Sequence, residues 1–142
     1  MSKGNTFEND FLRLIFNATA IGNIADNAAS SPLTNLHVSL HTADPGEAGD
    51  QTTSEANYTS YARVAVARSG SGWTVTDNSV SPAANIDFPA ATGGTNTITH
   101  FAVGTAASGT GKILYKGTVT PNISVTTGVT PRLETGTAIT ED

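Results

Sequence analysis

The sequence has no cysteine and little charge of either sign. Without cysteine, the 142-residue chain forms neither disulfide bonds nor thiolate metal sites, so its fold is independent of redox conditions. Charged residues make up 13% of the chain, about half of the usual ~25%. Seven basic and twelve acidic residues give a formal net charge of −5. This balance argues against nucleic acid as a partner, because phosphate contacts need clustered Lys and Arg.

Long hydrophobic runs are also absent. Residues 1–30 contain no charged-then-apolar pattern with a cleavage site, and no apolar run approaches the ~18 residues that a membrane span requires. We therefore expect no secretion signal and no membrane partner. The length suits one domain with its own hydrophobic core.

The sequence is rich in Thr and Gly and contains Val and Ile in its strand-like segments, and branched side chains suit a pleated sheet. Short strand-like segments alternate with turn signals, as in a β-sandwich. We predict a mainly β protein: a single antiparallel sandwich, with Greek-key or jelly-roll-like connections and one N-terminal amphipathic helix. The single domain would cover residues 1–142, with a helical arm at 1–22 and the sandwich at 34–142.

The helix is expected from Asn5 to about Ala20, with Gly22 as its stop. It carries one apolar stripe at helical spacing, formed by Phe7, Phe11, Leu14, Ile15 and Ala18. This stripe is predicted either to pack on the core of its own domain or to dock on a neighbouring subunit. The first four of these residues are therefore candidates for a partner interface.

The chain is organised around the stretch 36–68. Here Leu36–His41 alternates apolar and polar residues, which predicts a half-buried strand. Asp44, Pro45 and Gly46 then form a turn that sets the geometry of the polar loop after it, because Pro45 fixes φ and Gly46 tolerates positive φ. A second strand is expected at 61–68. Pro82 is expected to interrupt strand pairing.

Further strands are predicted from alternation and turn residues at 73–76, 79–80, 85–88, 97–103, 112–120, 123–125 and 137–140.

Four segments of the chain stand out as motifs: SLHTADPGEAG, YARVAV, THFAVGTAASGTGKILYKGTVT and the terminus TPRLETGTAITED. In these segments the chain resembles a family of small tailed-bacteriophage virion proteins, labelled phage tail fibre protein or head decoration protein. The resemblance covers nearly the whole chain after the helix. It implies a structural role in a phage particle and a virion location, after synthesis in the bacterial cytoplasm.

Two groups of side chains have the composition of metal sites but not the spacing. His37 and His41 share one strand face, about 13 Å apart by strand rise, which is too far for one zinc ion with Asp44. The acidic loop with Asp44, Glu47 and Asp50 lacks the spacing of a calcium-binding EF-hand. We expect no metal and no cofactor.

Catalytic motifs are incomplete as well. The run 106–113 nearly spells a phosphate-binding loop, but Ala106 replaces its first glycine and Ile113 its hydroxyl residue. There is no G-x-S-x-G motif for a nucleophilic serine. Trp73, Tyr58 and Tyr61 could form a sugar-stacking surface, although a core position for Trp73 is favoured. The chain is expected not to be an enzyme.

The function that these observations favour is that of a non-enzymatic structural subunit. The first candidate is a capsid decoration (cement) protein on the outside of the major capsid lattice. The alternative is a tail, baseplate or tail-fibre component, with or without a carbohydrate or receptor-binding role. The expected partners are the major capsid protein or other virion subunits, and further copies of the chain in a homo-oligomer.

Overall fold

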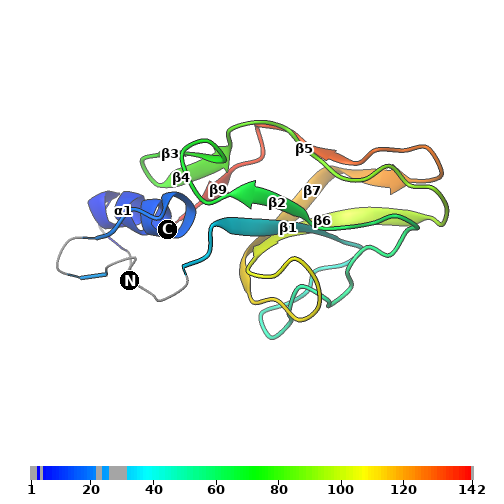
Figure 1. Ribbon diagram of the computed structural model, residues 1–142, viewed down its shortest axis with the longest axis horizontal. Coiled ribbons are helices and arrows are strands. Elements are labelled where there is room, and N and C mark those ends of the chain that lie inside the picture. Colours follow the sequence, from blue (N-terminus) through cyan, green and yellow to red (C-terminus); the bar gives the residue numbers. More distant parts are fainter. Residues whose placement is uncertain (1–2, 4, 22–23, 26–31, 142) are drawn as a thin grey trace. The chain divides into compact units, whose positions relative to one another are not determined.

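The computed structural model describes residues 3, 5–21, 24–25 and 32–141. It contains one helix, α1 (Asn5–Asn17), followed by nine strands (Figure 1). The prediction of a mainly β, antiparallel fold with one N-terminal helix is confirmed. No helix in the described ranges is both long and apolar enough to cross a membrane. Gly22, the expected helix stop, lies outside the described residues; the helix ends five residues earlier.

The strands form three sheets. The four-stranded sheet has the spatial order β2 (Val64–Ala67), β1 (Asn35–His41), β6 (Asn96–Gly104) and β7 (Ile113–Val125). The three-stranded sheet has the order β3 (Trp73–Thr76), β4 (Ser79–Pro82) and β9 (Ile139–Thr140). The two-stranded sheet contains β5 (Ile86–Asp87) and β8 (Arg132–Leu133).

The chain divides into two compact units. The first comprises Met1–Asn35, Val66–Asn85 and Glu134–Asp142, and the second comprises Leu36–Ala65 and Ile86–Leu133. In the first unit α1 lies beside β3 and β4 (Figure 1). In the second unit β6 pairs along most of its length with β1 on one side and with β7 on the other.

Helix α1 packs within the first unit mainly through a face other than the predicted stripe. Leu12 and Phe16 are fully buried, and the Phe16 ring meets the Trp73 ring edge-on at a centroid distance of 4.8 Å. Asn17 donates a hydrogen bond to the Trp73 carbonyl. The Arg68 guanidinium donates to the carbonyl oxygens of two residues in the last helical turn, which no later helical amide can reach.

Two proline positions differ from the sequence prediction. Pro82 does not interrupt pairing; it is the last residue of β4 and lies opposite Trp73. Pro121 lies inside β7, which runs without a break across the two strands predicted at 112–120 and 123–125. Because β7 is the last strand of its sheet, the missing proline N–H removes no hydrogen bond that a further strand would need.

Candidate functional site

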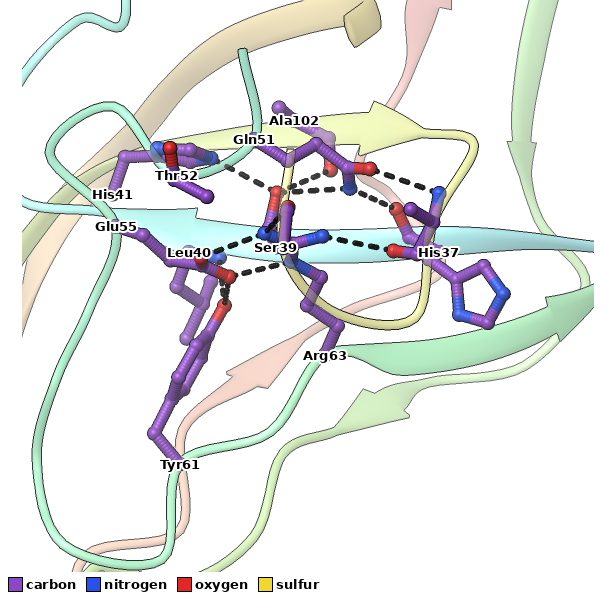
Figure 2. Close-up of polar contacts among 12 residues, drawn as sticks. His37, Ser39, Leu40, His41, Gln51, Thr52, Glu55, Tyr61, Arg63 and Ala102 are labelled. Atoms are coloured by element: carbon purple, nitrogen blue, oxygen red, sulfur yellow. Dashed lines mark hydrogen bonds and ion pairs between the residues drawn. The ribbon is translucent and has the colours of Figure 1, made fainter. Parts of the chain in front are cut away.

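The second unit contains a cluster of buried polar side chains on β1 (Figure 2). Ser39 and His41 are both fully buried, although a half-buried strand predicts that this face meets solvent. The Ser39 hydroxyl lies 2.9 Å from His41 Nε2, and His41 Nδ1 lies 2.8 Å from the Thr53 carbonyl oxygen. A carbonyl only accepts, so Nδ1 carries the proton and Nε2 of the neutral ring accepts from Ser39.

Gln51 covers this face from the loop that follows β1. Its side chain is fully buried, donates to the His37 carbonyl at 3.0 Å and accepts from the Ala106 amide at 3.1 Å. Its own backbone amide donates to the Gly111 carbonyl. Gln51, in the loop after β1, therefore joins β1 and its own loop to the loop between β6 and β7, which is distant in sequence (Figure 2).

Two glycines make room for Gln51. A Cβ atom on Gly104 would lie 2.1 Å from Gln51 Cδ, and one on Gly111 would lie 2.0 Å from its Oε1. Neither distance is possible between real atoms, so any larger residue at these positions would displace the glutamine. The glycines at the two ends of the β6–β7 loop are thus required by packing.

An ion pair between Glu55 and Arg63 lies beside the cluster. Arg63 Nε and Nη2 contact the two carboxylate oxygens at 2.6 and 2.8 Å, and the Arg63 side chain is only 2% exposed. Its remaining donors reach the carbonyls of Ala106 and Gly109. Tyr61 donates to Glu55 at 3.0 Å and accepts from the Leu40 amide. Bidentate geometry and further hydrogen bonds allow such a pair to stay charged when buried.

Burial and hydrogen bonding shift the pKa values of three groups in the cluster. Burial lowers the pKa of His41, which favours the neutral ring. The hydrogen bond to Glu55 raises the pKa of Arg63, and burial raises that of Tyr61 well above its ordinary value. Ser39 and His41 resemble a nucleophile and base in spacing, but a fully buried hydroxyl cannot meet a substrate.

The predicted turn at Asp44–Gly46 has side-chain partners of its own. Gly46 adopts a φ of 74° and donates its amide to Asp44 at 2.8 Å, and Pro45 is buried. Lys116 Nζ, from β7, lies 3.0 Å from Asp44 and 3.2 Å from Glu47. These bonds lower the pKa of Asp44, chiefly through the Gly46 amide, and raise that of Lys116, chiefly through Asp44.

The acidic loop does not gather its carboxylates around one point. Asp50 instead accepts from the amide and hydroxyl of Thr52. The side chains of Lys116 and Asp44 are also not prepared to form a covalent amide bond with each other. That reaction needs a neutral amine and a protonated carboxyl, whereas both groups here are held charged. Among the described residues, no group of three or more His, Asp or Glu side chains could hold a metal ion.

The remaining sequence motifs are structural in this fold. Lys112 of the near phosphate-binding loop is followed by strand β7, not by the helix that such a loop must open. Trp73 and Tyr58 are 2% and 3% exposed, so neither offers a ring face for stacking on a sugar. The core position favoured for Trp73 is the one observed.

The interface candidates on α1 lie on its outer faces. Phe7 is 41% exposed, its ring lies 6.2 Å from that of Phe11, and Phe11, Leu14 and Ile15 are only half-buried. The helix thus packs within its own unit through Leu12 and Phe16 while this aromatic pair remains accessible. Docking of the stripe on a neighbouring subunit stays a prediction.

Sequence reasoning missed the residues that connect the loop after β1 and the loop between β6 and β7 to the buried polar cluster on β1. Gln51, Glu55 and Arg63 stand in a polar segment with no periodic pattern that would place them in the interior. A signal was present in Gly104 and Gly111, the two glycines that flank the loop between strands. Without a contact map, however, nothing pairs these glycines with a glutamine more than fifty positions away.

No curated protein matches the chain at a significant level. A family model does match, over residues 5–140, and its description is "Podophage GP4 fiber I protein gp80". The match confirms the resemblance to small phage virion proteins and covers both compact units. The chain belongs to this podophage fibre protein family and is a structural component of the phage virion.

Proposed function

We propose that the protein is a non-enzymatic subunit of the podophage tail fibre, which joins other virion proteins through its surface. The observation that carries the proposal is the family match over residues 5–140. The fibre role is preferred to the capsid-decoration role, which was the first candidate from the sequence. The description of the matching family names a fibre and names no capsid.

The arrangement of polar groups supports a role without catalysis. The buried Ser39–His41 pair is enclosed, and the Glu55–Arg63 pair directs its further donors and acceptors to Tyr61 and to two loop carbonyls. These bonds fix the loop after β1 and the loop between β6 and β7 to each other. Rigid loops suit a subunit that must present a constant surface to its neighbours.

The outer face of α1 is the surface that we assign to contact with another virion protein. Phe7 and Phe11 form an aromatic pair of the kind that anchors protein interfaces when a partner removes it from water. Leu33, 43% exposed, adds an apolar side chain in the same unit. A contact of this type is specific when it buries roughly 1,000 Å² or more in total.

Locating the protein in purified virions tests the proposed function. Antibodies against the chain, imaged by electron microscopy, are expected to label the tail, and quantitative mass spectrometry should find a few to a few dozen copies per particle. Labelling over the whole capsid with hundreds of copies would instead establish the decoration role. A particle without the protein would refute both.

A further inference from the structure

A pocket in the first unit lies between the end of α1 and strand β3. Its volume is about 360 Å³, which is at the lower end of the ~300–1,000 Å³ typical of small-molecule sites. The helix and the turn after it contribute Arg13, Asn17 and Thr19 to its lining, and β3 contributes Trp73 and Thr74. Guanidinium, amide and hydroxyl side chains thus line the space, so it suits a small polar ligand.

Arg13 is the charged residue of this pocket. Of the seven basic side chains of the chain, four pair with carboxylates, and Arg68 binds backbone carbonyls of α1. Arg13 is exposed and forms no ion pair and no side-chain hydrogen bond in the part of the chain that the structure describes. Its planar guanidinium has five N–H donors, which match the two oxygens of a carboxylate.

Trp73 supplies a second donor without a partner. Its Nε1 is the one buried side-chain nitrogen or oxygen that has no hydrogen-bond partner among the described residues. An indole N–H can only donate, and a buried donor without an acceptor calls for a physical explanation. Because Trp73 lines the pocket, an acceptor oxygen held there, directly or through an ordered water, can satisfy this donor.

The backbone beside the pocket is held in one arrangement. Ala18 has a φ of 55°, a conformation that alanine rarely adopts, and the Thr19 amide donates to the Arg13 carbonyl at 3.1 Å. This turn ends the helix and brings Thr19 into the same lining as Arg13. The Asn17 side chain donates to the Trp73 carbonyl at 3.2 Å, which ties the helix to β3. The walls of the pocket are therefore formed before a ligand arrives.

We propose that this pocket binds a carboxylate that carries hydroxyl groups, the chemistry of a sugar acid. Arg13 pairs with the carboxylate, and the hydroxyl groups of the ligand exchange hydrogen bonds with the exposed side chains of Thr19 and Thr74. A helix C-terminus disfavours anions, but Arg68 is bonded to carbonyls of the last turn and offsets that effect. The ligand does not stack on Trp73, whose ring is buried.

The inference goes beyond the proposed function, which needs a surface for other virion proteins and no small ligand. The pocket and the aromatic pair of Phe7 and Phe11 also use different side chains of α1. Substitutions in the pocket can therefore be tested without altering the surface assigned to a virion partner.

The first experiment is an NMR titration of the full chain, in which the single tryptophan gives one indole N–H signal. The probe is glucuronate at constant ionic strength. Glucose, which lacks the carboxylate, and acetate, which lacks the hydroxyl groups, are the controls. We expect glucuronate to shift the indole signal in a saturable manner, and each control to bind at least about tenfold more weakly.

The second experiment repeats the titration on variants. Arg13→Ala should weaken glucuronate binding at least about tenfold, because the charge-assisted bonds are lost. Lys112→Ala is the matched control: Lys112 is also exposed and forms no ion pair in the described part of the chain, but it lies in the second unit. It should bind glucuronate as the wild type does.

A third variant, Gly70→Leu, fills the pocket without crowding its walls. Gly70 is part of the lining and has no positive φ, and a Cβ added there would meet only Asn17 Nδ2, at 3.9 Å. This variant should remain folded and lose glucuronate binding. Circular dichroism verifies the fold of each variant.

Three results would overturn the inference. They are no saturable shift at glucuronate concentrations up to roughly 100 mM, where millimolar affinities saturate, an equal response to acetate, or unchanged binding by folded Arg13→Ala. The outcome is separable from that of the virion experiment. A protein found in the tail that does not bind glucuronate keeps the fibre role and removes the pocket, whereas binding by a protein absent from the tail does the reverse.

Discussion

At the scale of single residues, Gln51 holds the segments around β1 together. Its side chain bonds to the His37 carbonyl and the Ala106 amide while fully buried. Buried amides that keep their hydrogen bonds are tolerated in a core, but a lost partner exposes the full cost of desolvation. Gln51 and the glycines that accommodate it should therefore behave as one unit.

A double-mutant cycle tests this coupling. Gln51→Ala is expected to destabilise the protein by about 1–3 kcal/mol through unsatisfied groups, and Gly104→Ala by about 1–3 kcal/mol through overpacking. In the double variant the new methyl group no longer meets Gln51, so the combined loss in urea unfolding should fall short of the sum by about 0.5–3 kcal/mol. Additive losses would contradict the coupling between the two residues.

Gly136→Ala is the matched control for this cycle. An added Cβ at Gly136 meets nothing within 4 Å, and this glycine has no positive φ. Its effect on the free energy of unfolding should stay within about 0.5 kcal/mol.

His41 should make the fold sensitive to acid. Burial lowers its pKa while the unfolded chain keeps the ordinary value near ~6.5, so the unfolded state binds the proton more tightly. Its contribution to stability is present above ~6.5 and is lost as pH falls through the range below it. Glu55 opposes this lowering, whereas Arg63 and His100 add to it.

NMR titration of the imidazole signals checks this directly, together with urea unfolding between neutral and mildly acidic pH. The His41 ring should titrate below the ordinary histidine range, and His41→Gln should flatten the acid side of the stability curve. A ring that titrates at or above the ordinary value would show that the site is open to water.

At the scale of elements, the sequence predicted the positions of the strands better than their burial and their pairing register. Alternation and turn residues located β3 and the core of β6 within a residue or two, because period-two patterns are local. Burial of both faces of β1 was not predictable, since Gln51 reaches that face from a loop. Register shifts in β6 near Ile98–His100 and Val103–Gly104 likewise depend on pairing with β7.

The helix shows that periodicity alone does not tell which apolar face packs within the unit. The segment Asn5–Asn17 has apolar residues on more than one side, and the stripe with Phe7 and Phe11 has the larger aromatic content. The face that packs has only Leu12 and Phe16 at its centre, joined by a buried Glu8. Contact with Trp73 decides between the faces, and that contact is long-range in sequence.

The turn at Gly46 gives a test of loop geometry. Gly46 has a φ of 74°, and a Cβ atom added to it would meet no atom within 4 Å, so the cost of substitution there is conformational and not steric crowding. Gly46→Val should lose about 1–3 kcal/mol of stability, whereas Gly46→Asn should lose much less, because asparagine tolerates this region. Equal unfolding midpoints for the two variants would exclude a role for positive φ.

The outer face of α1 can be separated from its packing face by substitution. Phe7→Ser with Phe11→Gln should leave the melting temperature nearly unchanged but reduce incorporation into virions in a complementation assay. Leu12→Ala, the control on the packing face, should lose about 2–5 kcal/mol of stability. If the outer-face variant assembled normally, α1 would have no part in attachment.

At the scale of the whole molecule, the two compact units are interleaved in sequence. The chain passes between them four times, after Asn35, Ala65, Asn85 and Leu133. Neither unit is a continuous segment of the chain. Each unit includes residues that follow parts of the other in sequence, so neither unit can finish folding before most of the other has been synthesised. This is the physical basis for keeping the prediction that residues 1–142 form a single domain.

A single domain of this size should unfold in one cooperative transition. The chain offers a local reporter for the first unit, because its one tryptophan, Trp73, is buried there. The imidazole signal of His41 reports on the second unit, where that ring is fully buried. In urea, Trp73 fluorescence and the His41 NMR signal should change with the same midpoint, since four chain passages couple the units. Separate midpoints would instead identify two domains that fold independently, with Trp73 and His41 assigning each transition to its unit.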